Sequence, residues 1–188
     1  MAGFKAGGPK NRKVSCCKCL PRSASAVQQR FRQLSCATDN SGMIHTVRLQ
    51  LSTSGQGDAH DITAKAAGAL KESGLTSGVM TVFVTGSTAA VTTIEFEPGA
   101  VSDFNRLFEQ LAPRRGDYRH HLRWGDDNGS SHVRAALLGP SLTIPFVGAA
   151  LTLGTWQQIM LVEFDTSARR REVVVQMIGE GQQDVSRL

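Results

Sequence analysis

The chain has 188 residues, 40% of them hydrophobic and 20% charged, so it is long and apolar enough for one domain with its own core. Its net charge of +5 comes from residues 1–42, which hold eight cationic side chains and one acidic one. The remaining 146 residues hold 13 cationic and 15 acidic side chains. These numbers exclude a wholly disordered chain, and no apolar run approaches the roughly 20 residues of a membrane-spanning helix. We predict a basic, disordered extension over 1–42 and a single domain over 43–188, in a cytoplasmic protein with no membrane partner.

The extension contains all four cysteines, so disulfides cannot hold the predicted domain together, which fits a reducing compartment. The spacing C-C-x-C in residues 16–19 differs from a pair of C-x-x-C zinc knuckles, which argues against zinc there. A basic extension can bind nucleic acid, but the domain is slightly acidic and lacks a basic groove studded with aromatic residues. Nucleic acid is therefore not expected as a partner.

The first half of the domain predicts strands around a helix. Residues 44–52 alternate apolar and polar side chains imperfectly, which favours a strand. Residues 61–74 place apolar side chains at helical spacing and end at a glycine, which predicts a helix. Two β-branched runs, 79–86 and 87–96, predict strands that meet at a glycine turn.

The clearest helix is predicted over 101–113, with Ser102 or Asp103 as its N-cap and Pro113 as its end. Its apolar residues recur at i, i+3, i+4 and i+7, and are Phe104, Leu107, Phe108 and Leu111. This spacing predicts one face that packs on the core.

The second half predicts a long polar loop over 114–131, a short helix over 132–139, and strand, turn and strand over 140–154. A buried strand follows over 156–164, and residues 171–180 are predicted to return as its hairpin partner. The fold class is therefore α+β, with two main helices and antiparallel connections at the C-terminal end.

The polar loop contains the densest group of chemically useful side chains. Imidazoles and carboxylates together can bind a divalent metal or exchange protons near neutral pH. The alternative is a solvated loop with ordinary surface histidines. The group consists of Tyr118, His120, His121, Asp126, Asp127, Asn128 and His132.

Two further segments could contribute to a site. The turn before 89–95 carries Ser87 and Thr88, whose hydroxyls and backbone N–H groups could hold a phosphate, although the segment is no Walker A loop. The turn LGTWQQ places Trp156 and Gln157 at the mouth of the buried strand. The alternatives are a plain strand turn for the first, and core packing of Trp156 or a subunit seam for the second.

The run SLTIPFVGAALTLGTWQQIMLVEF, together with STAAVTTIE, GDYRHHLRWGDDN, SHVRAALLGPS and VVVQMIGE, resembles the YjbQ-type family. The resemblance covers about residues 43–180. It implies a compact domain with a bent, mainly antiparallel sheet, assembly as a homotrimer and a site near subunit contacts.

The activity that this resemblance implies is secondary thiamine-phosphate synthesis, a transferase step of thiamine biosynthesis. An aminopyrimidine diphosphate and a thiazole phosphate are joined, and pyrophosphate is released. Two family histidines are absent here, because Thr85-Gly86-Ser87 stands where many members have P-H-T, and Ser130 replaces the first histidine of N-x-H-x-H. A non-catalytic homotrimer that binds a small molecule or a metal is therefore the alternative.

The resemblance also implies roles for individual residues, with a phosphorylated small molecule as substrate and Mg²⁺ or another divalent metal as cofactor. The expected catalytic residues are His120, His132 and Asp127. The expected substrate-binding residues are Ser87, Thr88, Arg134, Trp156 and Gln157. The expected metal ligands are Asp126, Asp127 and Glu95.

Overall fold

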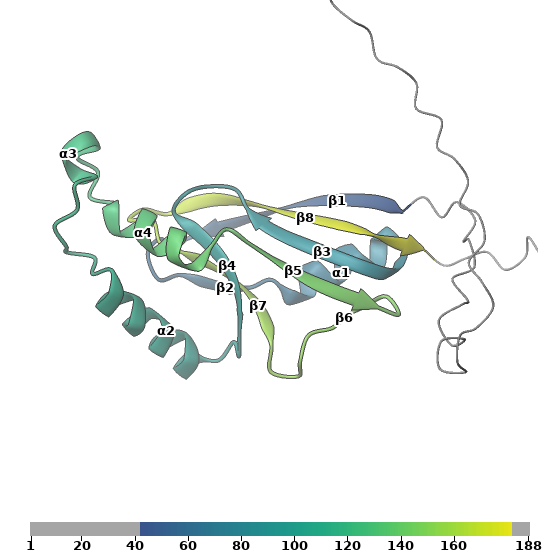
Figure 1. Cartoon of the computed structure of the whole chain (residues 1–188). Coiled ribbons are helices and arrows are strands. Elements are labelled where there is room, and N and C mark those ends of the chain that lie inside the picture. Colours follow the sequence, from purple (N-terminus) through teal and green to yellow (C-terminus); the bar gives the residue numbers. More distant parts are fainter. Residues whose placement is uncertain (1–41, 182–188) are drawn as a thin grey trace, which may run out of the picture. The chain divides into compact units, whose positions relative to one another are not determined.

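The computed structural model describes residues 42–181, and the cysteines of the predicted extension lie outside them (Figure 1). The strands are β1 (Met43–Thr53), β2 (Ala59–Asp61), β3 (Leu75–Val84), β4 (Ala89–Ile94), β5 (Ser141–Val147), β6 (Ala150–Leu151), β7 (Gln158–Glu163) and β8 (Arg169–Gly181). The helices are α1 (Thr63–Ser73), α2 (Pro98–Leu111), α3 (His121–Trp124) and α4 (Gly129–Leu138). The predicted α+β class is confirmed. Within 42–181, no helix has the length and apolar character needed to cross a bilayer.

The strands form two antiparallel sheets, with orders β1-β8-β3-β5-β6 and β2-β7-β4. The predicted hairpin between 156–164 and 171–180 is therefore wrong, because β7 pairs with β2 and β4 while β8 pairs with β1 and β3. Residues 164–168 carry the chain from one sheet to the other. Proximity along the sequence favoured the hairpin, but tertiary packing places the two strands in different sheets.

Strand β7 is buried on both faces. Ile159 and Leu161 belong to a core that includes α1 and the larger sheet, whereas Met160 and Val162 belong to a second core with α2 and α4. Successive strand residues point to opposite faces, so a strand between two cores must be apolar at every position. This double burial explains the unbroken apolar run IMLV.

Helix α2 begins earlier than predicted, at Pro98. The N-cap is Glu97, whose carboxylate accepts a hydrogen bond from the backbone N–H of Gly99 at 2.8 Å. Neither Ser102 nor Asp103 caps the helix, because both lie inside it. Proline suits the first helical turn, where its missing N–H group costs nothing.

Only part of the predicted apolar face of α2 is buried. The rings of Phe104 and Phe108 lie 4.8 Å apart, and Phe108 lies 5.1 Å from Phe164, which follows β7. Leu107 and Leu111 stay exposed. The aromatic cluster therefore fixes α2 against the smaller sheet through one narrow stripe.

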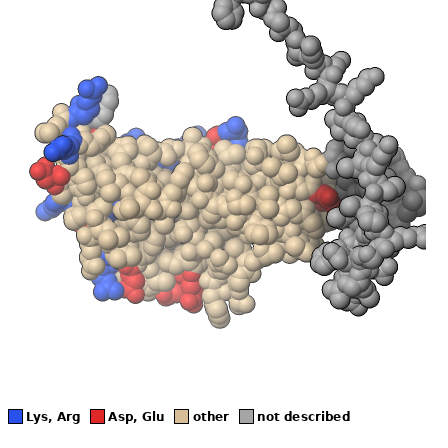
Figure 2. Space-filling view, viewed as in Figure 1, with Lys and Arg blue, Asp and Glu red and all other residues tan. Residues whose placement is uncertain are grey.

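The outer face of the larger sheet is mostly uncharged. On β3 and β8 the exposed residues Val79, Phe83 and Ile178 alternate with buried ones, so they point away from the core. In the view of Figure 2, charged side chains gather at the margins and the broad surface between them has none. Exposed apolar residues gathered on one face are typical of association surfaces.

A buried ion pair joins the two sheets. Arg171 of β8 donates from Nε and Nη2 to the two carboxylate oxygens of Glu163 of β7, at 2.6 Å in both cases. Glu163 is 0% exposed and Arg171 is 8% exposed. The Thr53 hydroxyl of β1 also donates to Glu163, at 2.8 Å. These contacts bond three strands around a single carboxylate.

Asp165 extends this network to the turn before β4. Its carboxylate accepts hydrogen bonds from the Thr88 hydroxyl at 2.9 Å and from the Arg169 guanidinium at 3.1 Å. Burial alone would raise the pKa of Asp165. The hydrogen bonds from Arg169, the Ser167 backbone and Thr88 outweigh burial and hold that pKa below its ordinary value of 3.8.

The variant Glu163→Gln should be strongly destabilised, because it removes the anion that accepts two hydrogen bonds from the buried Arg171 guanidinium and leaves only Asp165, at 3.9 Å. We expect a loss of about 3–5 kcal/mol in the free energy of unfolding, measured by urea titration. Glu172→Gln is the matched control: it removes a half-buried carboxylate that pairs with the exposed Arg48, and should cost under about 1 kcal/mol. Equal losses in the two variants would contradict this role.

Asp165 should make stability fall in acid. Because its folded-state pKa is below 3.8, its contribution is complete above that pH and is lost as pH falls through the lowered pKa. Between about pH 5 and pH 2.5, the free energy of unfolding should fall more steeply for the wild type than for Asp165→Asn. Urea titrations at each pH measure this, and parallel profiles would refute it.

Candidate functional site

Strand β4 separates the predicted site residues into two groups. Ser87 and Thr88 precede the strand, whereas Glu95 follows it. Because Ile94 pairs with Gln158, Trp156 and Gln157 lie at the Glu95 end. Six strand residues at about 3.3 Å each separate the two groups by roughly 20 Å.

The two predicted catalytic histidines meet at the Ser87 end. The ring centroids of His120 and His132 lie 4.5 Å apart, and Oδ1 of Asp126 lies 3.9 Å from Nε2 of His120. His132 also lines a hollow of about 360 Å³. The other residues that line it are Gly86, Ser87, Ala89, Ala135, Ala136 and Pro140. Imidazoles beside a hollow of this size are suited to proton exchange with a small ligand.

The polar loop brings these histidines together by folding back on itself. Gly125 has φ 67° and Asp127 has φ 51°, so two left-handed residues reverse the chain between α3 and α4. The backbone N–H of Gly129, the first residue of α4, then donates to Nε2 of His121 at 3.3 Å. An imidazole thus caps α4 and ties it to α3.

Buried polar atoms without a hydrogen-bond partner lie close together along the same loop. Four buried side-chain atoms have no hydrogen-bond partner within residues 42–181, and three of them belong to His120, Asn128 and Ser131. At 3.9 Å, Asp126 is too far from His120 Nε2 for a hydrogen bond. Buried polar atoms are normally paired, so this loop is where a polar ligand would gain most.

Two predicted phosphate contacts have other partners. The Thr88 hydroxyl bonds Asp165 and also accepts from Arg171 at 2.7 Å, and its residue is buried. Arg134 is 1% exposed, donates from Nε to the Ala112 carbonyl at 2.8 Å, and pairs with Glu109 at 2.7 Å. These side chains support the fold around the hollow rather than face into it.

The predicted metal ligands do not come together in this chain. Asp127 lies beside His121, with Oδ1 3.7 Å from Nδ1, whereas Glu95 lies at the far end of β4. Across residues 42–181, no three histidine, cysteine, aspartate or glutamate side chains are close enough to hold a metal ion. The carboxylates of one chain therefore do not fit the expected Mg²⁺.

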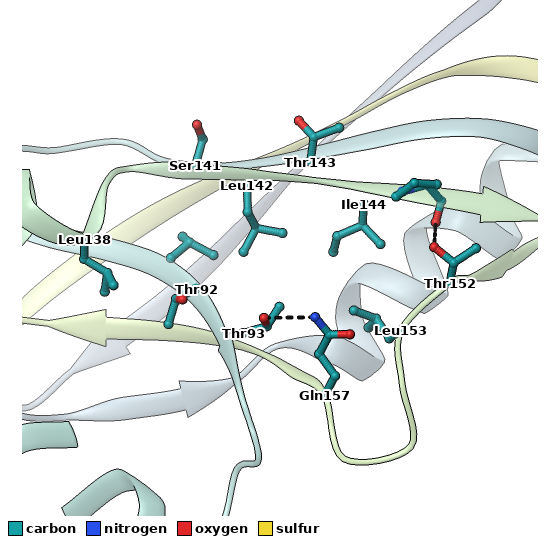
Figure 3. A pocket seen from close by; sticks show the side chains of 12 residues that line it. Thr92, Thr93, Leu138, Ser141, Leu142, Thr143, Ile144, Thr152, Leu153 and Gln157 are labelled. Atoms are coloured by element: carbon teal, nitrogen blue, oxygen red, sulfur yellow. Dashed lines mark hydrogen bonds between the residues drawn. The ribbon is translucent and has the colours of Figure 1, made fainter. Parts of the chain in front are cut away.

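The far end of β4 has its own hydroxyl and amide groups. Gln157 donates from Nε2 to the Thr93 hydroxyl at 3.1 Å and accepts the Gly154 N–H at 3.1 Å (Figure 3). Trp156 is 71% exposed, so the core-packing alternative is wrong, and it does not line the cavity beside Gln157. Thr92 and Thr93 line that cavity but were not predicted as site residues. The T-T pair in the run AAVTTI was the available sequence signal.

Gly129→Ala should disturb the loop. A Cβ there would lie 2.5 Å from Cβ of Tyr118 and 3.0 Å from Nε2 of His121, so both side chains must move. We expect a loss of about 1–3 kcal/mol in the free energy of unfolding and faster trypsin cleavage within 114–123.

Gly68→Ala is the control for this prediction, because nothing lies within 4 Å of the added Cβ on α1. Alanine in a helix interior should raise stability by about 0.5–1 kcal/mol. Changes of the same sign in both variants would mean that the crowding at Gly129 is not decisive.

The sequence matches the family described as UPF0047 protein YjbQ-like over residues 47–180. A UPF0047 protein of Methanothermobacter thermautotrophicus is 36% identical over 137 residues, which are 73% of this chain and 94% of that protein. The UPF0047 protein YugU of Bacillus subtilis is 30% identical over 132 residues, which are 70% of this chain and 97% of that protein.

Solved structures agree with this relationship. A YbjQ-like protein of unknown function from Sulfolobus solfataricus has a TM-score of 0.71 at 31% identity, covering 74% of this chain and 99% of that one. An uncharacterized protein of the YjbQ/UPF0047 family from Clostridium acetobutylicum has a TM-score of 0.63 at 34% identity, covering 70% and 98%. Motifs, fold and relatives lead to one assignment: the chain belongs to the YjbQ-like UPF0047 family.

Proposed function

We propose that the chain is a weak thiamine-phosphate synthase whose proton chemistry takes place at the hollow beside His132. The observation that carries the proposal is the contact between the rings of His120 and His132, 4.5 Å apart, next to Ser87. Two imidazoles that can exchange protons near neutral pH suit a reaction with an anionic leaving group.

The reaction forms a C–N bond and breaks a C–O bond. The thiazole nitrogen attacks the methylene carbon of the aminopyrimidine, and pyrophosphate leaves with the electron pair of the C–O bond. His132 would donate a proton to the departing oxygen, and His120 would hold the His132 ring in place. The Ser87 hydroxyl and its neighbouring backbone N–H groups would bind phosphate oxygens at the rim.

Several expected residues have no direct step in this mechanism. Arg134 and Thr88 would position the hollow through their buried bonds, and Asp127 would act on His121 rather than on the catalytic pair. Trp156 and Gln157 lie at the opposite end of β4. No step uses a metal, because the carboxylates do not converge; the divalent metal remains a prediction.

Assembly as a homotrimer is part of the proposal. The mostly uncharged outer face of the larger sheet, with Val79, Phe83 and Ile178 exposed, supports association of copies. Light scattering on the full chain measures the mass directly.

A non-catalytic binding trimer is the second candidate. It is favoured by the shortage of cations at the hollow, where His132 is the one ionisable side chain among the lining residues. Pyrophosphate usually needs several charge-assisted hydrogen bonds.

The test is synthesis of thiamine phosphate by the purified full chain from both phosphorylated precursors, with and without Mg²⁺. His132→Ala should lose about 10²- to 10⁴-fold in rate, the usual contribution of a general acid or base. His45→Ala, which removes an imidazole from β1, should keep the rate. Circular dichroism melts would confirm that both variants fold.

Equal rates in the wild type and His132→Ala would assign the activity to a contaminating enzyme and refute the proposal. No activity in any of the folded proteins would refute the catalytic proposal and favour the binding trimer.

A further inference from the structure

A second cavity, of about 370 Å³, lies where the edges of the two sheets meet (Figure 3). Strand β4 is an edge strand of the smaller sheet. Strand β5 pairs with β3 on one side and meets β6 only near its end, at Phe146 and Val147, so most of its other side has no strand partner. The backbone N–H of Val91 on β4 donates to the carbonyl of Gly139, which follows α4, and residues of β4 and β5 next to this contact line the cavity.

The cavity has an apolar side and a polar side. The apolar side consists of Val91, Leu138, Leu142, Ile144 and Leu153, and the polar side of Thr92, Thr93 and Gln157. Figure 3 shows Leu142 and Ile144 facing Thr93 and Gln157 across the space, whereas Ser141 and Thr143 point away from it. None of the residues that line the cavity is charged.

The polar side offers a fixed set of donors and acceptors. Gln157 is held by two hydrogen bonds, from Nε2 to Thr93 and from the Gly154 N–H to Oε1. A carboxamide has two N–H donors and two acceptor lone pairs, so one of each remains for a ligand. The Thr93 oxygen accepts from Gln157, which leaves its O–H free to donate.

We propose that this cavity binds a neutral heteroaromatic ring with a lactam-type edge. An adjacent N–H and C=O on such a ring would pair with the remaining acceptor and donor of the Gln157 amide. The ring face would rest on the leucine and isoleucine side chains. A sugar has hydroxyls on every side, and those that faced the leucine and isoleucine side chains would have no hydrogen-bond partner. A phosphate or carboxylate finds no cation among the lining residues.

This inference goes beyond the proposed activity and does not depend on it. The cavity and the His132 hollow have no lining residue in common, so a ring could bind here whether or not chemistry occurs there.

The test is an NMR titration of the ¹⁵N-labelled full chain with uracil, which is neutral at pH 7 and carries a lactam edge. Saturable shifts are expected at the Gln157 side-chain amide and at the Thr93 backbone amide. Orotate, the same ring with a carboxylate, should bind at least about tenfold more weakly, because a charge in an uncompensated site is costly. Absence of saturable shifts at these two residues, or tighter binding of glucose or orotate, would overturn the proposal.

Three variants locate the binding. Thr93→Val keeps the side-chain shape and removes the hydroxyl, and Gln157→Leu removes the amide. Each should weaken the affinity for uracil by about tenfold, as the loss of a hydrogen bond predicts. Thr143→Val is the matched control, since its hydroxyl bonds Thr81 and points away from the cavity. Equal weakening by Thr143→Val would overturn the proposal.

His132→Ala separates this proposal from the catalytic one. It should leave uracil binding unchanged even though it abolishes the proposed activity. If no activity is found in any protein but uracil still binds at Gln157, only the catalytic proposal fails.

Discussion

The two sheets are held in their relative position by a carboxylate that is fully buried and a guanidinium that is almost fully buried. Glu163 and Arg171 form two parallel hydrogen bonds, and both ions would be costly to bury alone. The turn before β4 rests on this pair: a Cβ at Gly86, where φ is 133°, would lie 2.8 Å from Nη1 of Arg171. The hollow beside His132 therefore has its shape because a glycine lies against a buried guanidinium.

The hollow beside His132 and the ring cavity are neighbours that share no lining residue. Ala89 and Pro140 line the hollow, whereas Val91 and Ser141 line the cavity, so the same two chain segments contribute to both. Family motifs that stand close together in the sequence, such as S-L-T-x-P and L-G-T-W-Q, converge on the cavity, whereas S-T-A-A and the polar loop converge on the hollow.

The sequence predicted those features that local patterns determine. The apolar run of β7, the stripe of Phe104 and Phe108, and the glycine end of α1 follow from periodicity and capping. Strand pairing could not be predicted from local patterns. The sequences of β7 and β8 fit a hairpin, and only the second core shows that β7 belongs to the other sheet.

Side-chain roles were harder to predict than elements. Arg134 and Thr88 were predicted to bind substrate, and only the packed structure shows that their side chains are bonded within the fold. The contact between His120 and His132 depends on left-handed backbone at Gly125 and Asp127. Glycine hints at such a conformation, but an aspartate does not specify it.

The double burial of β7 has a consequence for how the molecule fluctuates. Its backbone is hydrogen-bonded to β2 on one side and β4 on the other, and side chains cover both faces. Exchange of its amide hydrogens with solvent therefore requires both cores to open, which links it to global unfolding. Ala89 of β4 pairs with Glu163 of β7 and lines the hollow beside His132, so this wall of the hollow shares the resistance of β7 to local opening.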